Sequence, residues 1–150
     1  MGEVLALDAS VVVKWFKRGE EREAEAMSLR DGVLGSRVSA VTSEWLFLET
    51  VRALVKVGYP HDKIKEVYST LRELTSLGFI EAVPVGAALD KAVEIEAALS
   101  LYASDSVYLA TAIIRGAKLV TEDRHLLRDD VVDYAKREGI EILSLAEAQL

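Results

Sequence analysis

The chain has 150 residues, of which 51% are hydrophobic and 29% charged, and its formal net charge is −7. This length and composition predict one globular domain, residues 1–150, and exclude a disordered, collagen-like or low-complexity chain. The negative charge argues against a broad nucleic-acid-binding surface, because such surfaces attract phosphates with Lys and Arg. No apolar run approaches the roughly 20 residues that span a bilayer, and the first residues lack the pattern of a secretory signal, so we expect a cytoplasmic protein without a membrane partner.

Several residue types are missing or scarce. There is no Cys, which excludes disulfides, zinc–thiolate sites and a cysteine nucleophile. The two histidines, His61 and His125, are far apart in the sequence, so a histidine-rich metal site is excluded too. A bound metal would therefore be held mainly by carboxylates, which are ligands typical of Mg²⁺ and Mn²⁺. The absence of Asn, together with a single Gln, suggests a thermophilic source.

Short apolar strands alternate with amphipathic helices along the whole chain. We expect strands at residues 3–7, 37–41, 80–85, 117–121 and 140–143. We expect helices at residues 10–16, 20–29, 43–57, 60–77, 87–100, 106–115 and 130–138, and a short terminal helix capped by Ser144. Because right-handed crossovers join such strands, the pattern predicts an α/β fold with three layers: a parallel sheet of about five strands with helices on both faces.

Four acidic residues lie near the ends of these predicted elements. Asp8 directly follows the first strand, and Asp123 lies two residues beyond the fourth. Asp105 lies at the entry of a helix, and Glu49 lies one and a half turns into the helix after the second strand. Open α/β sheets bind ligands beyond the carboxyl ends of their strands. We therefore expect these acids to gather in one crevice.

Each acid also has a purely structural interpretation. Asp8 and Asp105 can cap the helices that follow them, and Asp123 can serve as a turn residue. Glu49 can pair with Arg52 on the next turn of its helix. No single position decides between the two roles, but the combination of four favours a shared site.

Four segments together resemble the PIN-domain ribonuclease family, in particular the VapC-type toxins of toxin–antitoxin pairs. LALDASVVV at residues 5–13 resembles the opening strand with its first aspartate, and FLETVRAL at residues 47–54 resembles the glutamate helix. YASDSVYLA at residues 102–110 resembles the helix with the third acid, and LVTEDRHL at residues 119–126 resembles the turn with the fourth. The similarity covers essentially the whole chain, with the segments in the family's order.

This resemblance implies an endoribonuclease that depends on Mg²⁺ or Mn²⁺ and leaves a 5′-phosphate and a 3′-hydroxyl. Asp8, Glu49, Asp105 and Asp123 would be its catalytic acids and metal ligands, with Asp8 and Asp105 in direct contact with the ion. The hydroxyls of Ser10 and Thr121 lie near two strand ends, where they would orient ligands or waters. Their alternative roles are those of a helix cap and a turn hydroxyl.

The sequence departs from the family pattern before the glutamate helix. Residues 41–43 are Val-Thr-Ser, where the family pattern would have a Pro. Glu44 is therefore an alternative to Glu49 as a metal ligand. A spacing of five residues separates the two by about 140° around a helix, so they cannot both face one ion. The motif around Glu49 favours that residue.

The resemblance also implies partners. VapC-like proteins commonly form homodimers, and the wide apolar face of the predicted helix at residues 60–77 is a candidate interface; ordinary core packing is its alternative. A small antitoxin would place a basic or bulky residue over the acids. RNA would contact scattered basic residues around the site, namely Lys14, Lys17, Arg18, Arg124 and Arg128.

Other enzyme classes fit less well. A haloacid-dehalogenase-type phosphatase needs an acid where Ser10 stands, and a receiver domain needs an Asp after a middle strand that here ends at residues 83–86 in Val-Pro-Val-Gly. A serine hydrolase needs a Gly-x-Ser-x-Gly turn, which is absent. Two alternatives remain within the PIN resemblance: a catalytically silent binding module, and an RNA-processing nuclease that is not a toxin.

Overall fold

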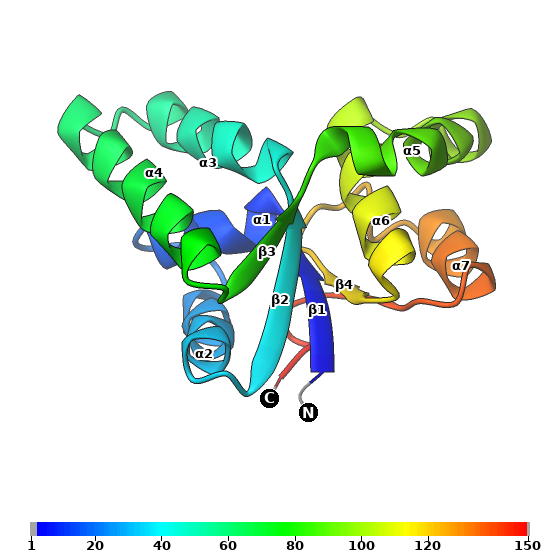
Figure 1. The fold of residues 1–150 in the computed structure, drawn as a ribbon, viewed down its shortest axis with the longest axis horizontal. Coiled ribbons are helices and arrows are strands. Elements are labelled where there is room, and N and C mark those ends of the chain that lie inside the picture. The colour runs from blue at the N-terminus through cyan, green and yellow to red at the C-terminus, as the bar shows by residue number, and fades with distance from the viewer. Residues whose placement is uncertain (1–2, 150) are drawn as a thin grey trace.

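The computed structural model describes residues 3–149 and shows a five-stranded parallel sheet with the order β3-β2-β1-β4-β5 (Figure 1). The strands are β1 Glu3–Leu7, β2 Val38–Ser43, β3 Ile80–Val83, β4 Lys118–Val120 and β5 Ile142–Leu143. The helices are α1 Ala9–Val12, the 3₁₀ helix η1 Val13–Trp15, α2 Glu23–Leu34, α3 Trp45–Lys56, α4 His61–Ser76, α5 Val85–Leu99, α6 Ala103–Arg115 and α7 Asp129–Arg137. The predicted α/β fold class is confirmed.

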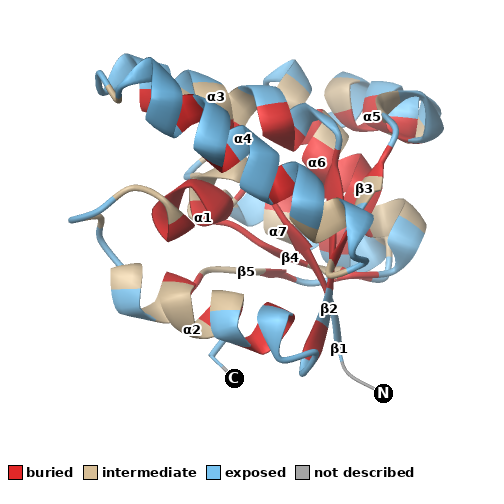
Figure 2. Ribbon diagram, turned by 60° about the vertical axis from the view of Figure 1, so that its left-hand side comes forward, coloured by how far each residue is buried: buried red, intermediate tan, exposed pale blue. Residues whose placement is uncertain are grey.

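The helices form a layer on each side of the sheet. Helices α1 to α4 lie on one side and α5 to α7 on the other (Figure 1). Leu5 and Leu7 of β1 pack into the first of two hydrophobic cores and Ala6 into the second, because successive side chains of a strand point to opposite faces. Figure 2 shows buried residues on the helix faces that meet the sheet. None of the helices in residues 3–149 is both long and apolar enough to cross a membrane.

Strand β1 lies at the centre and pairs in parallel with β2 on one side and β4 on the other. Ala6 is in register with Val41 and with Leu119, and Leu7 with Val120. These three strands therefore end at the same edge of the sheet. The residues that directly follow them are placed together by the parallel register alone.

Three predicted boundaries were wrong in ways that matter for the site and the ends of the chain. Helix α6 begins at Ala103, so Asp105 lies inside its first turn and is not its N-cap. Helix α2 begins and ends later than predicted, because Arg22 has the left-handed φ of 61° and the buried Gly32 is accommodated inside the helix. After Ser144 the chain forms turns at residues 145–148 and no helix.

The apolar face of α4 is part of the chain's own core. The core includes the buried side chains of Ile64, Val67 and Leu71, and Leu74 packs alongside them. Tyr68 is the exposed aromatic residue of this helix. The sequence-based argument for a dimer through this face is therefore wrong, because these side chains are already covered within one chain.

Candidate active site

The four predicted acids line one cleft at the carboxyl edge of the sheet. Asp8, Glu49, Asp105 and Asp123 surround a volume of about 300 Å³ between α1, α3, α6 and the loop after β4. Glu44 is not part of this lining; it is exposed at the start of α3. The remaining lining residues are Ala9, Ser10, Tyr102, Ser104, Tyr108 and His125.

Asp8 is 3% exposed and is held by two hydroxyls. Ser10 donates to its Oδ1 at 2.6 Å, and Thr121 donates to its Oδ2 at 2.5 Å. The backbone N–H of Glu122 donates to the Ser10 oxygen at 2.9 Å, and that of Asp123 donates to the Thr121 oxygen at 3.0 Å. These N–H donors occupy the hydroxyl oxygens, so each hydroxyl directs its own proton at Asp8. Asp8 makes no side-chain cap bond to α1, contrary to its structural interpretation.

The environment of Asp8 disfavours its charged form. Burial, with a smaller contribution from the nearby charge of Asp123, raises the pKa of this carboxyl to about 6. The hydrogen bonds from Ser10 and Thr121 lower the pKa but do not offset the loss of water. A positive charge in the cleft would therefore stabilise Asp8 in the ionised form.

Asp105 lies in the first turn of α6 and is 7% exposed. Burial, together with the charges of Asp123, Asp8, Glu49 and Glu96, raises its pKa to about 7. The three other acids of the cleft thus all act on this one carboxyl. The four side chains form one electrostatic unit.

Tyr108 was not singled out from the sequence, although it follows Asp105 by three residues and so lies on the same side of α6. It is 3% exposed, and its hydroxyl has no hydrogen-bond partner among residues 3–149. Burial and the charge of Glu49 raise the pKa of this phenol, which lies beside Glu49 but outside hydrogen-bonding geometry. A buried, unpaired hydroxyl in a polar cleft is typical of a site that holds water or a ligand.

The structural interpretation holds for Asp123 but not for Glu49. Asp123 does form a turn, because its Oδ1 accepts hydrogen bonds from the N–H groups of His125 at 2.8 Å and Leu126 at 3.3 Å. The same side chain lines the cleft, so the turn fixes its position there. Glu49 is half-buried and forms no ion pair with Arg52 in the described part of the chain.

No three His, Asp or Glu side chains among the described residues are already arranged as a finished metal cage. The chemistry of the cleft nevertheless fits a hard divalent cation. Its donors are carboxylate oxygens, two of its carboxyls have raised pKa values because of burial and like charge, and it contains an unpaired hydroxyl. A divalent ion bound by oxygen ligands and water would offset each of these costs.

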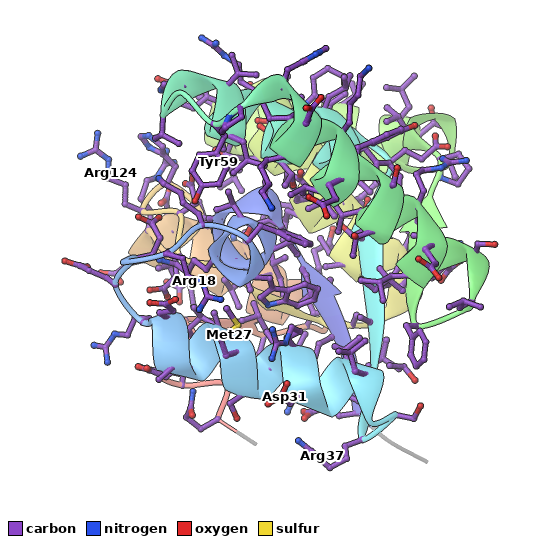
Figure 3. All side chains as sticks on the ribbon, turned by 90° about the vertical axis from the view of Figure 1, so that its left-hand side faces the viewer. Arg18, Met27, Asp31, Arg37, Tyr59 and Arg124 are labelled. Carbon is purple, nitrogen blue, oxygen red and sulfur yellow. The ribbon has the colours of Figure 1, made fainter. Side chains whose placement is uncertain are left out.

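Four of the five basic residues named above have hydrogen-bond or ion-pair partners within the chain. Arg124 is exposed and has no ion pair in residues 3–149, and Figure 3 shows it projecting away from the fold. Arg124 is therefore an accessible basic side chain for a phosphate. The other four candidates have partners: Lys14 donates to the Glu21 carbonyl, Lys17 faces Glu20, Arg18 faces Glu23, and Arg128 pairs with Asp130.

Comparisons with solved structures show where this fold occurs. VapBC2 from Rickettsia felis, crystallised with a DNA fragment from its promoter, has a TM-score of 0.61 at 16% identity, covering 94% of this chain and 98% of that one. VapBC-5 from Mycobacterium tuberculosis, of the VapBC family of toxin–antitoxin systems, has a TM-score of 0.55 at 20% identity, with coverage of 94% and 98%. FitAcB from Neisseria gonorrhoeae has a TM-score of 0.55 at 15% identity, with coverage of 95% and 98%. At these identities the likeness establishes a shared fold.

A comparison by sequence establishes the family. No curated protein matches the chain. The family model of the PIN domain matches residues 5–132, a stretch that contains all four acids of the cleft. The chain therefore belongs to the PIN domain family, a family of nucleases.

Proposed function

We propose that this protein is an endoribonuclease that depends on Mg²⁺ or Mn²⁺ and is the toxin of a VapBC-type toxin–antitoxin system. The observation that carries the proposal is the convergence of Asp8, Glu49, Asp105 and Asp123 on one cleft of about 300 Å³. A nuclease of this class needs carboxylates that hold a divalent ion against a phosphodiester. The family match to a nuclease domain supports the same chemistry.

The residues of the cleft have distinct parts in this mechanism. Asp8 and Asp105 would hold the ion directly, and Glu49 and Asp123 would bind it directly, through water, or through a second ion. When bound, the ion lowers the pKa of a coordinated water and stabilises charge on the phosphate during hydrolysis. Ser10 and Thr121 fix both oxygens of Asp8 and so set the direction in which its free lone pairs point. The products are a 5′-phosphate and a 3′-hydroxyl.

The fold neighbours favour a toxin over an RNA-processing nuclease. VapBC-5 is a member of a toxin–antitoxin family, and VapBC2 carries the same family designation. We accordingly propose a small antitoxin partner that places a basic or bulky side chain over the acids. The gene next to this one should encode it, and coexpression should relieve a growth arrest that the chain alone causes. Continued growth during expression of an active enzyme would favour the RNA-processing alternative.

A homodimer is a further part of the proposal, but α4 does not supply its interface. The exposed large apolar side chains of α3 and α5 are the alternatives, and they include Trp45, Leu48, Leu89 and Val93. Light scattering at micromolar concentration should give twice the mass of 16.5 kDa. A monomer at that concentration would remove the dimer from the proposal. We also propose that the protein is located in the cytoplasm.

The central test is cleavage of structured RNA by the purified protein with Mg²⁺, with Mn²⁺, and with EDTA. We expect cleavage with either metal and none with EDTA. The Asp8→Asn variant, purified in the same way, should be inactive, which would exclude a contaminating ribonuclease. Cleavage that persists in EDTA contradicts the metal-dependent mechanism, and complete inactivity over a broad RNA panel favours a silent binding module.

A further inference from the structure

A second cavity, of about 360 Å³, lies next to the acid cleft. The two share the lining residues Tyr102 and His125. The second cavity is completed by Ser100, Leu101 and Arg128. These residues come from the turn between α5 and α6 and from the segment between β4 and α7. Its volume is within the range of roughly 300–1,000 Å³ that is typical of small-ligand pockets.

Tyr102 presents an aromatic surface at the junction of the two hollows. Its side chain is 68% exposed, and its ring lies edge to face with the imidazole of His125, with ring centres 5.2 Å apart and planes at 77°. Tyr102 is the N-cap residue of α6, and the backbone N–H of His125 donates to Asp123 of the acid cleft. An exposed aromatic face beside a phosphodiester site is suited to stacking with a nucleobase.

The charge of the cavity favours a neutral ligand group. Arg128 donates through Nε and Nη2 to the two carboxylate oxygens of Asp130, at 3.0 and 2.8 Å. Nη2 also donates to the carbonyl of Leu99 at 3.0 Å. The guanidinium is thereby fixed and its charge is balanced. Such a group attracts a second phosphate weakly, but it can still donate to the polar edge of a base.

We propose that this cavity binds the base of a nucleotide next to the cleaved phosphodiester, stacked on Tyr102 with its edge toward Arg128. The inference rests on the proposed nuclease function of the acid cleft. It assigns Tyr102 and His125 as substrate-binding residues, and it makes single-stranded RNA the substrate form at this position. A stacked base must leave the helical stack of a duplex to enter the cavity.

Binding of fluorescent RNA tests the subsite without requiring cleavage. The probe is a single-stranded RNA heptamer containing 2-aminopurine, whose fluorescence falls when the base stacks. All proteins carry Asp8→Asn so that the RNA remains intact. The variants are Tyr102→Ala, Tyr102→Phe and, as a matched control, Tyr68→Ala, which removes another exposed tyrosine, on α4.

We expect Tyr102→Ala to weaken binding by about tenfold and to abolish the fluorescence change, in line with the cost of losing one stacked base. Tyr102→Phe keeps the ring and should bind within about twofold of the parent protein, as should Tyr68→Ala. An abasic heptamer should bind with the same affinity to the Asp8→Asn parent protein and to its three variants. A loss of abasic binding in Tyr102→Ala would mean that the tyrosine does not act by stacking, and would overturn the proposal.

The outcomes separate the subsite from the nuclease function. If the wild type cleaves RNA but Tyr102→Ala binds the heptamer as tightly as Tyr102→Phe, the nuclease stands and the subsite is wrong, with a protein side chain as the alternative occupant. If the wild type does not cleave RNA but binding depends on Tyr102, the subsite stands and the nuclease is wrong. The absence of heptamer binding to any of the proteins overturns the subsite.

Discussion

The hydroxyl of Thr121 donates a 2.5 Å hydrogen bond to the carboxylate of Asp8, although the two residues are 113 positions apart in the sequence. Their proximity follows from the pairing of β1 with β4, which puts Leu7 in register with Val120 directly before them. The bond lowers the pKa of Asp8 and so opposes the effect of burial, which leaves the pKa of this carboxyl raised to about 6. Thr121 thus favours the charged form of Asp8, which is the form that can bind a cation.

Replacing Thr121 with Val should weaken metal binding while leaving the fold intact. The substitution keeps the branched shape but removes the donor to Asp8 and the acceptor for the Asp123 N–H. Losing a hydrogen-bond partner of a metal ligand typically costs about 10- to 100-fold in metal affinity. Titration calorimetry with Mn²⁺ measures the change. Thr111→Val is the matched control, because the Thr111 hydroxyl is buried and donates to the Val107 carbonyl within α6; an equal loss in both variants would contradict the role of Thr121.

Asp8→Asn and Asp105→Asn should each eliminate detectable RNA cleavage, whereas Glu44→Gln should leave it nearly intact. Each Asn removes a charge from the cleft, and Glu44 lies outside the cleft. The loss of cleavage should exceed that caused by Thr121→Val, because each Asn substitution removes a metal ligand itself and not a residue that positions one. The metal-induced rise in melting temperature should shrink in the two Asn variants. Full activity and an unchanged metal-induced rise in Asp8→Asn would show that the site assignment is wrong.

The metal-free protein should become less stable as the pH rises from 5 to 8. The folded-state pKa values of Asp8, about 6, and Asp105, about 7, exceed the ordinary value of 3.8. The folded state therefore holds more protons than the unfolded state in this range, and the associated stability is lost as the pH rises through the folded values. Between pH 5 and 8, Asp8 alone accounts for a loss on the order of 1 kcal/mol, because its folded-state pKa of about 6 lies one unit above the start of that range.

Chemical denaturation of the metal-free protein at several pH values measures this dependence. Asp8→Asn should flatten the slope, and saturating Mn²⁺ at pH 8 should restore stability in the wild type. Acids with lowered pKa values, such as Asp130 and Glu138, reverse the trend only at more acidic pH, since they lose their charges there. Stability that increases between pH 5 and 8 would contradict the electrostatic description of the cleft.

Tyr108→Phe should stabilise the metal-free protein and reduce cleavage a fewfold. The hydroxyl is buried without a partner in residues 3–149, and an unpaired buried polar group costs about 1–3 kcal/mol. Removing it should raise the melting temperature by about 2–4 °C for each kcal/mol recovered. Tyr134→Phe is the control, since the Tyr134 hydroxyl donates to Glu138 at 3.2 Å and its loss should not stabilise. A lower melting temperature for Tyr108→Phe would indicate that water satisfies its hydroxyl.

The composition makes one prediction about heat stability. The chain has no Asn, no Cys and a single Gln, Gln149. If this depletion reflects a thermophilic source, the wild type should melt above about 65 °C, the upper end of the range for mesophilic domains. Differential scanning calorimetry with Mn²⁺ present measures the midpoint. A midpoint within the mesophilic range would count against that source.

The general position of the acid cleft was predictable, because it depends on where strands end. Asp8 and Asp123 follow β1 and β4, and the parallel register brings such positions together whatever the intervening sequence. The detailed support of Asp8 was only partly predictable. Ser10 and Thr121 were identified by their position, but their bonds to Asp8 depend on the register of two strands from opposite ends of the chain.

Other features depend on packing that leaves no periodic pattern in the sequence. The Tyr102–His125 contact joins the start of α6 to the segment after β4, so neither local sequence indicates it. At the carboxyl end, the sequence predicts a short helix capped by Ser144, and the structure has turns instead. The N–H groups of Ser144 and Glu147 bond to each other's side chains as in a helix cap, yet only turns follow. A cap satisfies the first N–H groups, but it does not supply the buried face that sustains a helix.

The position of β4 beside β1 has a consequence for protein synthesis. A growing chain that ends before Lys118 already contains Asp8, Glu49 and Asp105, but it lacks β4, Asp123 and the Thr121 hydroxyl that orients Asp8. The complete cleft therefore assembles only after β4 and the loop that follows it have been synthesised. Translation products that stop before β4 carry three of the acids and yet lack the complete cleft.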